Sequence, residues 1–297
     1  MIDPSQVLGE FSPIRLKRRT MATLIWSRLR KNKVAVIGGS FVLFLILCAI
    51  FAPVIAPYPY TKANFLATYQ GPSWQHWFGT DELGRDMLSR LLYSLQTACV
   101  IGFGAELVEV TLGLFLGAVA GYVGGVIDAI LMRIVDVVYG FPSLLFSIVL
   151  VVMLGHSVFA ILIAVAATSW VGMARLVRGQ VMVIKESDYI SAARGLGATW
   201  WQILRRYVIP NSLGPVVVAI TFGIPANMMV ESALSLLGLG VEPPTPSWGA
   251  LISNGQTSLF SFPYLLIFPT ATFALTLLSF TYLGDGLRNV FDSKSLR

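Results

Sequence analysis

The chain has 297 residues, of which 56% are hydrophobic and only 12% are charged. Soluble domains contain about 25% charged residues, so this composition excludes an ordinary water-soluble protein and indicates a surface that faces lipid. The net charge of +6 does not indicate nucleic-acid binding, because the basic residues stand between hydrophobic segments instead of forming one basic block. Two isolated histidines and the cysteines Cys48 and Cys99, both within apolar segments, predict neither a metal site nor a disulfide.

Six apolar segments are long enough to cross a bilayer, which takes about 20 residues of helix. They comprise residues 34–56, 95–122, 130–154, 158–176, 213–237 and 264–287. Pro142 lies inside the third segment, and Gly223 and Pro225 lie inside the fifth. Only residues 155–157 separate the third from the fourth, which predicts a tight hairpin. The segments predict an all-α, polytopic membrane protein with six transmembrane helices.

The basic residues predict the orientation of these helices. Eighteen of the 21 lysines and arginines fall before the first segment, around the link between the fourth and fifth, after the sixth, or at the matching end of the third. Because positive charge marks the cytoplasmic side, both termini are predicted to be cytoplasmic. Residues 14–33 alternate basic and apolar groups, which predicts an amphipathic helix on the inner membrane face. The expected division is a cytoplasmic segment, 1–33, a first helix with an external loop, 34–91, and a core transmembrane domain, 92–297.

The cytoplasmic segment 177–211 is much longer than a helical hairpin needs. Ser187 and Asp188 are suitable N-caps for a short helix over residues 189–194, which Gly195 and Gly197 can end. A second helix is predicted over residues 199–208, where Pro210 stops it before the fifth segment. Because the first helix carries mostly small side chains, it is thin enough to enter a groove on a partner protein. The alternative is an ordinary interfacial loop helix.

The external part of segment 34–91 carries two pairs of opposite charges at i,i+4 spacing, Asp81 with Arg85 and Asp86 with Arg90. Asp81 is a suitable N-cap, and the leucines that follow share one face. This pattern predicts a helix on the outer surface that leads into the second transmembrane segment. Such a helix either rests on the membrane or contacts the solute.

A second external loop follows Gly238 and is stiffened by three prolines, Pro243, Pro244 and Pro246, before it reaches Trp248. It is either a docking surface for an external protein or a rigid cap over the helix ends.

Acidic residues within membrane segments are unfavourable and usually have a specific role. Glu106 and Glu109 lie deep in the second segment, and Glu231 lies in the outer part of the fifth. All three are candidates for a translocation pathway or for subunit pairing, with Glu106 or Glu231 expected to face the cavity. The alternative is a hydrogen-bonded structural acid. Glycines at every fourth position from 113 to 125 predict a smooth helix face for close packing, inside the subunit or against a partner.

One motif in the cytoplasmic segment resembles that of a known family. Ser191-Ala192-Ala193, then Gly197, then Tyr207-Val208-Ile209-Pro210 resembles the EAA loop of ABC importer permeases, in which Glu-Ala-Ala, three residues, Gly, nine residues and Ile-x-Leu-Pro follow each other. The spacing matches throughout, while Ser191 replaces Glu, Tyr207 replaces Ile and Ile209 replaces Leu. The missing glutamate removes one possible salt bridge to an ATPase and leaves the shape of the helix unchanged.

Other stretches resemble the C-type permease of oligopeptide and dipeptide importers. They are residues 78–90, which begin Phe-Gly-Thr-Asp, residues 132–136 and 141–145, and residues 234–249, which end Pro-Pro-Thr-Pro-Ser-Trp-Gly. The resemblance implies a type I importer permease in a prokaryotic plasma membrane. It implies as partners a second permease, two P-loop ATPases that use ATP and Mg²⁺, an external binding protein, membrane lipid and a peptide solute. It also implies an ATPase-coupling loop that includes Ser191, Ala192, Ala193, Arg194, Gly195, Gly197, Tyr207, Ile209 and Pro210.

The chain itself contains no Gly-x-x-x-x-Gly-Lys-Ser/Thr phosphate loop and no visible catalytic constellation, so we expect neither enzymatic activity nor a cofactor. The acids and the proline-broken segments leave an ion-driven secondary transporter as an alternative. A membrane scaffold protein that transports no solute is a second alternative. Nickel chelates, glutathione and oligosaccharides are alternative solutes for the importer.

Overall fold

The computed structural model describes residues 27, 30 and 32–291. Within these residues the chain is helical and contains no β-strand. The helices are α2 (Lys33–Ile55), α3 (Met87–Val123), α4 (Gly125–Tyr139), α5 (Ser143–Leu154), α6 (Val158–Lys185), α7 (Asp188–Gly195), α8 (Trp200–Ile203), α9 (Ile209–Leu236), α10 (Trp248–Thr257) and α11 (Tyr264–Phe291). Most of the amphipathic helix predicted for residues 14–33 lies outside the described residues.

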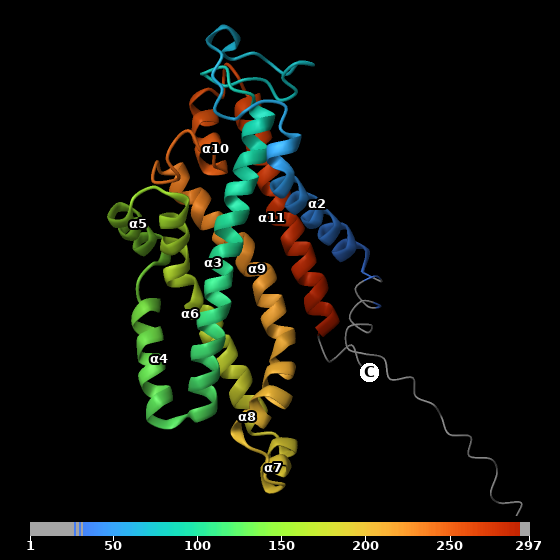
Figure 1. Cartoon of the computed structure of the whole chain (residues 1–297), viewed down its shortest axis with the longest axis vertical. Helices are drawn as coiled ribbons and strands as arrows, with labels where there is room; N and C mark the ends of the chain where they lie inside the picture. Colours follow the sequence, from blue (N-terminus) through green and yellow to red (C-terminus); the bar gives the residue numbers. More distant parts are fainter. Residues whose placement is uncertain (1–26, 28–29, 31, 292–297) are drawn as a thin grey trace, which may run out of the picture.

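The structure has five or six candidate crossings where six were predicted, and the third differs from the prediction. Among the described residues, five helices are long and apolar enough to cross a membrane, and α4 with α5 forms a sixth crossing if the two are taken as one span. We expected one helix over residues 130–154, but the two halves meet at 81°. Proline is the cause, because the ring of Pro142 cannot donate a backbone hydrogen bond and clashes with the preceding turn. Figure 1 shows α4 along the bundle and α5 at an angle to α4, where it packs against α6.

The first and last long helices run antiparallel along one side of the bundle (Figure 1). A side chain at Gly286 of α11 would overlap Ala35 of α2, and one at Gly38 would lie 2.9 Å from the carbonyl oxygen of Ser279. The start of α2 and the end of α11 therefore lie side by side, as an even number of crossings requires.

The glycine stripe of α3 packs against α6 within the same chain. A side chain at Gly117 would overlap the carbonyl oxygen of Ala174, and one at Gly121 would lie 2.8 Å from the carbonyl oxygen of Arg178. Gly113 faces Met173 in the same way, whereas Gly125 faces open space. Of the two alternatives for this stripe, packing inside the subunit is the one observed for the first three glycines.

Two helix ends near α7 differ from the sequence expectation. Helix α6 continues to Lys185 instead of ending near residue 176. Pro210 does not stop a helix, since it stands in the first turn of α9, directly after a π-helical turn. A π-helical turn, η3 (Leu204–Val208), joins α8 to α9, so that helical structure runs from Trp200 to Leu236.

The external regions also contain differences. Helix α3 runs without a break from Met87 to Val123, so the helix expected at the outer surface is the first part of α3 and not a separate element. Helix α10, within the region expected to be a loop, packs against α9 and α11 at the end of the bundle opposite α7 (Figure 1). We call these two ends of the molecule the α7 end and the α10 end.

Candidate functional site: a membrane cavity, an exposed terminal helix and an external cap

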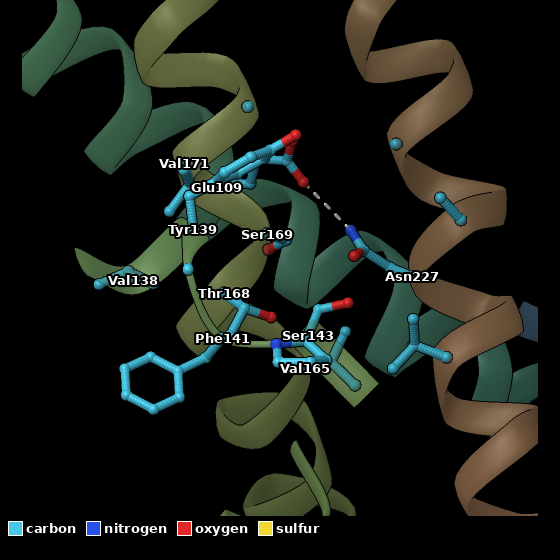
Figure 2. Close-up of a pocket in the computed structure, with 16 residues that line it drawn as sticks. Glu109, Val138, Tyr139, Phe141, Ser143, Val165, Thr168, Ser169, Val171 and Asn227 are labelled. Carbon is cyan, nitrogen blue, oxygen red and sulfur yellow. Dashed lines mark hydrogen bonds between the residues drawn. The ribbon is translucent and has the colours of Figure 1, made fainter. Parts of the chain in front are cut away.

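A cavity of about 620 Å³ opens between α3, the break from α4 to α5, α6 and α9. Figure 2 shows its polar lining, with Glu109 from α3, Ser143 from the first turn of α5, Thr168 and Ser169 from α6, and Asn227 from α9. Tyr139, Phe141 and several aliphatic residues complete the wall. Non-helical backbone is tolerated at membrane depth where it lines a cavity, and the break after Tyr139 lies in this position.

Glu109 is the cavity acid, and Glu106, one turn earlier on α3, lies behind it. The amide nitrogen of Asn227 donates to Oε2 of Glu106 at 3.3 Å and to Oε2 of Glu109 at 3.5 Å. Glu106 is only 3% exposed and does not line the cavity. Its carboxylate occupies the space left free by Gly223, where a side chain would overlap it. A glycine on α9 therefore makes room for a buried acid on α3.

Glu231 lies away from the cavity near the α10 end of α9. It is fully buried and accepts hydrogen bonds from the hydroxyl of Ser235 at 2.8 Å and from that of Ser232 at 3.2 Å. This is the environment of a hydrogen-bonded structural acid, the alternative that the sequence left open. Neither Glu106 nor Glu231 lines this cavity, whereas Glu109 does. The role of Glu106 or Glu231 in a translocation pathway or in subunit pairing stays a prediction.

Two ion pairs attach α4, one wall of the cavity, to α6. Arg178 donates two hydrogen bonds to Asp128, at 2.6 and 2.7 Å. Arg175 donates to Asp136 at 2.7 Å and lies 4.0 Å above the ring of Tyr139. The sequence showed these charges but not their pairing, because the partners are about 40 to 50 positions apart.

Helix α7 forms the tip of the α7 end (Figure 1). Ile190 is fully buried in a cluster with Ile184 of α6, Ile203 of α8 and Val208 of η3. Ala193 is also buried. The other side of the helix is exposed, with Ser191, Ala192, Arg194 and Gly195. Leu196 follows, with 89% of its surface exposed. The short helix predicted from the sequence is confirmed, with one buried face and one exposed face on which Ser191, Ala192 and Gly195 are small.

The connection from α7 to α9 is short and well defined. Gly197 has a φ of +84°, so it forms the left-handed turn that ends α7. Thr199 and Gln202 then form a capping box for α8, and the ring of Tyr207 lies 6.0 Å from that of Tyr189. Ile209 and Pro210 are exposed at the start of α9. Helix α8, η3 and α9 then follow one another without a break.

The charged residues before α3 form a buried cluster, which corrects the predicted surface helix. Oδ2 of Asp81 accepts from Nε of Arg85 and from Nη1 of Arg90, both at 2.7 Å. The Asp81–Arg85 pair is as predicted, but Arg90 pairs with Asp81 and not with Asp86. Asp86, not Asp81, caps α3, and its Oδ1 lies 2.9 Å from Nδ1 of His76. These side chains stabilise a cap at the α10 end and are not available to contact a solute.

The proline-rich loop presents only part of its sequence to solvent. Pro243 and Pro244 are exposed, whereas Pro246 is buried and Trp248 has no exposed surface. The backbone N–H of Glu242 donates to the carbonyl oxygen of His156 at 3.0 Å, so the loop is attached to the hairpin between α5 and α6. Trp248 therefore acts as a core residue beneath this loop.

Comparisons with known proteins identify the family. Residues 113–297 match the model described as "Binding-protein-dependent transport system inner membrane component". The chain belongs to this family. Residues 20–72 match the "N-terminal TM domain of oligopeptide transport permease C". The larger match contains all of α7 and the cavity lining except Glu109, which lies four positions before the match begins.

Named relatives cover nearly the whole permease. The dipeptide transport system permease protein DppC of Bacillus subtilis is 41% identical over 273 residues, which are 92% of this chain and 85% of that protein. The oligopeptide transport system permease protein OppC of Haemophilus influenzae is 37% identical, over 97% of this chain and 94% of that protein. The glutathione transport system permease protein GsiD of Pectobacterium atrosepticum is 39% identical, over 93% of this chain and 92% of that protein.

Two solved structures share the fold. A chain of the MetNI methionine ABC transporter in an inward-facing conformation superposes with a TM-score of 0.54 and 18% identity, covering 69% of this chain and 97% of that chain. A chain of an amino acid ABC transporter crystallised with histidines superposes with a TM-score of 0.53 and is 18% identical. This match covers 68% of the present chain and 94% of that chain. The permease is thus a multi-pass inner-membrane subunit of an ABC importer, and the ion-driven carrier is not supported.

Proposed function

We propose that this permease forms half of a peptide pathway through the membrane, that a second permease forms the other half, and that two P-loop ATPases drive it with ATP and Mg²⁺. An external binding protein would deliver the peptide. The relatives support a peptide solute, since two of them are named for dipeptides and oligopeptides and a third for glutathione, itself a tripeptide. The α7 end would face the cytoplasm, where the basic residues predict both termini.

The cavity around Glu109 supports the pathway half of the proposal. It lies within the bundle between helices that belong to the family's shared region. Its lining mixes hydroxyl, amide and carboxylate groups with aromatic and aliphatic ones, which suits a peptide with a polar backbone and variable side chains. A second permease placed against the open side would complete the enclosure.

Helix α7 is the observation that carries the coupling half of the proposal. It is attached through Ile190 and leaves Ala192 and Gly195 free at the tip of the molecule. A groove on an ATPase can accept such a thin helix, and closure of the ATPase pair would then push it. The continuous path from η3 into α9 would carry this movement to Asn227 in the cavity, as rigid-body coupling between two sites requires.

The experiment is a pull-down of the tagged permease from its native membrane in mild detergent. Gly195→Trp places a large side chain on the exposed face of α7, where nothing lies within 4 Å of the new Cβ. Gly71→Trp is the matched control, because Gly71 is equally unobstructed and lies in the external segment before α3.

We expect the wild type and Gly71→Trp to recover a second permease and P-loop ATPases. Gly195→Trp should keep the second permease and lose the ATPases. Absence of ATPases from the wild-type sample would refute the importer complex, and their retention with Gly195→Trp would refute the docking role of α7. ATP-dependent uptake of a dipeptide, compared with glutathione, by the reconstituted complex with its binding protein then identifies the solute.

A further inference from the structure

The lining of the cavity contains one carboxylic acid and no basic side chain. Glu109 is the only ionisable acid or base among its lining residues apart from the phenol of Tyr139. Arg175 approaches the rim through the Tyr139 ring, but its guanidinium is paired with Asp136, and Arg178 is paired with Asp128. Both arginines that pair with α4 are therefore already neutralised, and the lining itself contains an acid but no basic side chain.

The hydrogen-bonding capacity of the carboxyl groups of Glu106 and Glu109 is only partly satisfied. Asn227 contributes one amide nitrogen to both carboxyl groups, and its contacts of 3.3 and 3.5 Å are long. Oε1 of Glu106 is buried without a hydrogen-bond partner. Two neighbouring carboxylates repel each other in a low-dielectric interior, and either a shared proton or a nearby cation relieves the repulsion. The cavity side of Glu109 is the open position for such a cation.

We propose that Glu109, with the hydroxyl groups of Thr168 and Ser169, forms a subsite for the protonated amine of the transported solute. This inference rests on the proposed function as a peptide pathway. A primary ammonium group has three donors and no acceptor. Figure 2 shows that all three oxygen-bearing side chains line the cavity, and each can accept one hydrogen bond.

Such a subsite distinguishes solutes by their amine and not by their side chains. Every unmodified peptide carries an ammonium group, including the γ-linked tripeptide glutathione, whereas an N-acetylated peptide does not. Side chains of different sizes can extend toward Val165 and Phe141, which offer apolar surface. The subsite therefore accounts for recognition common to many peptides at one position of the pathway.

The first test measures the charge of the cavity directly in the assembled complex in membrane vesicles. Cys48 and Cys99 are replaced by alanine, and Ala226→Cys, an exposed lining residue, becomes the reporter. Its reaction rates with a cationic and an anionic methanethiosulfonate reagent are compared, with Ser143→Cys as a second reporter.

We expect the ratio of cationic to anionic rates to fall about a hundredfold in Glu109→Gln, because one unit charge ~8 Å away changes each rate about tenfold, in opposite directions, at a dielectric constant of ~30. Glu231→Gln, which removes an acid outside the cavity, should leave the ratio unchanged. If Glu109→Gln leaves the ratio unchanged at both reporters, a shared proton neutralises the pair and the subsite does not exist.

The second test uses protection of the same reporter. L-alanyl-L-alanine should slow modification of Ala226→Cys in the wild-type background, and its N-acetyl derivative should slow it at least tenfold less. Glu109→Gln should abolish the difference, and equal protection by both peptides without this substitution would overturn the proposal. ATP-driven peptide uptake by the parent complex is measured in parallel. Absence of uptake would refute the proposed function, while uptake with equal protection would refute the amine subsite alone.

Discussion

Asp81→Asn changes one atom in the buried ionic cluster at the α10 end, and its effect can be estimated from the contacts. Asp81 is only 4% exposed. Its Oδ1 accepts from the backbone N–H groups of Leu83 and Arg85, both at 2.9 Å, and its Oδ2 accepts from the side chains of Arg85 and Arg90. Asparagine can keep the first two bonds but would direct an NH₂ group at two guanidinium groups.

The substitution therefore leaves two buried arginines without their shared counter-charge. Arg85 keeps one bond, to Glu82, while Nε of Arg90 already lacks a partner. Removing one partner of a buried ion pair lowers stability by about 3–5 kcal/mol. For a chain of this size each kcal/mol lowers Tm by about 2–4 °C, so we expect a fall of roughly 6–20 °C.

The assay is the fraction of permease that remains monodisperse by size-exclusion chromatography after heating in detergent. Glu82→Gln is the matched control, because Glu82 also pairs with Arg85, at 3.0 Å, but its side chain is 37% exposed. Exposed pairs contribute about 1 kcal/mol or less, so this variant should lose at most a few degrees. If Asp81→Asn loses no more than Glu82→Gln, the cluster does not stabilise the cap and the reasoning is refuted.

Three further predictions concern the helices around the cavity. Gly117→Leu should lower stability in the same assay by about 1–3 kcal/mol or more, since the new side chain must displace α6. The control Gly179→Leu lies in open surroundings on α6 and should leave stability unchanged. Equal losses of stability in the two variants would contradict the packing of α3 on α6. Arg178→Asp should reduce both stability and uptake, and the exchange Arg178→Asp with Asp128→Arg should restore part of each, whereas no recovery would exclude this pair as the link between α4 and α6. Ile190→Ala removes the anchor of α7, at about 2–5 kcal/mol for a buried side chain of this size, so peptide uptake should fall more than ATP hydrolysis, and a parallel fall would indicate general unfolding.

Several features of this protein follow from the sequence because they depend on local properties. Hydropathy and length predict the membrane segments, since backbone in lipid must satisfy its own hydrogen bonds within each helix. Ser187, Asp188 and Gly197 mark α7 because caps and left-handed turns involve only a few neighbouring residues. The spacing from Ser191 to Pro210 indicates the family without reference to the fold, because it is a property of the sequence alone.

The tertiary structure decided which side chains meet. Glu106 and Glu109 lie about one helical turn apart on α3, and the sequence makes each of them a candidate for the pathway. Their directions differ by about 60° around the axis, because each residue turns the helix by 100°. Only the crossing of α3 with α6 and α9 determines that Glu109 lines the cavity while Glu106 lies behind it against Gly223.

The same reason accounts for the remaining differences. Arg90 has Asp86 four positions before it, but the chain turns between Asp81 and Met87, and this turn brings Asp81 closer to its guanidinium. Helix α10 has no long apolar run, and its formation depends on Trp248 becoming buried against α9 and α11. The sequence by itself determined the membrane class, the six crossings, α7 and the family resemblance, which are local or additive properties. Only the tertiary structure decided the cavity, its single acid and the ion pairs, because these depend on how distant helices pack.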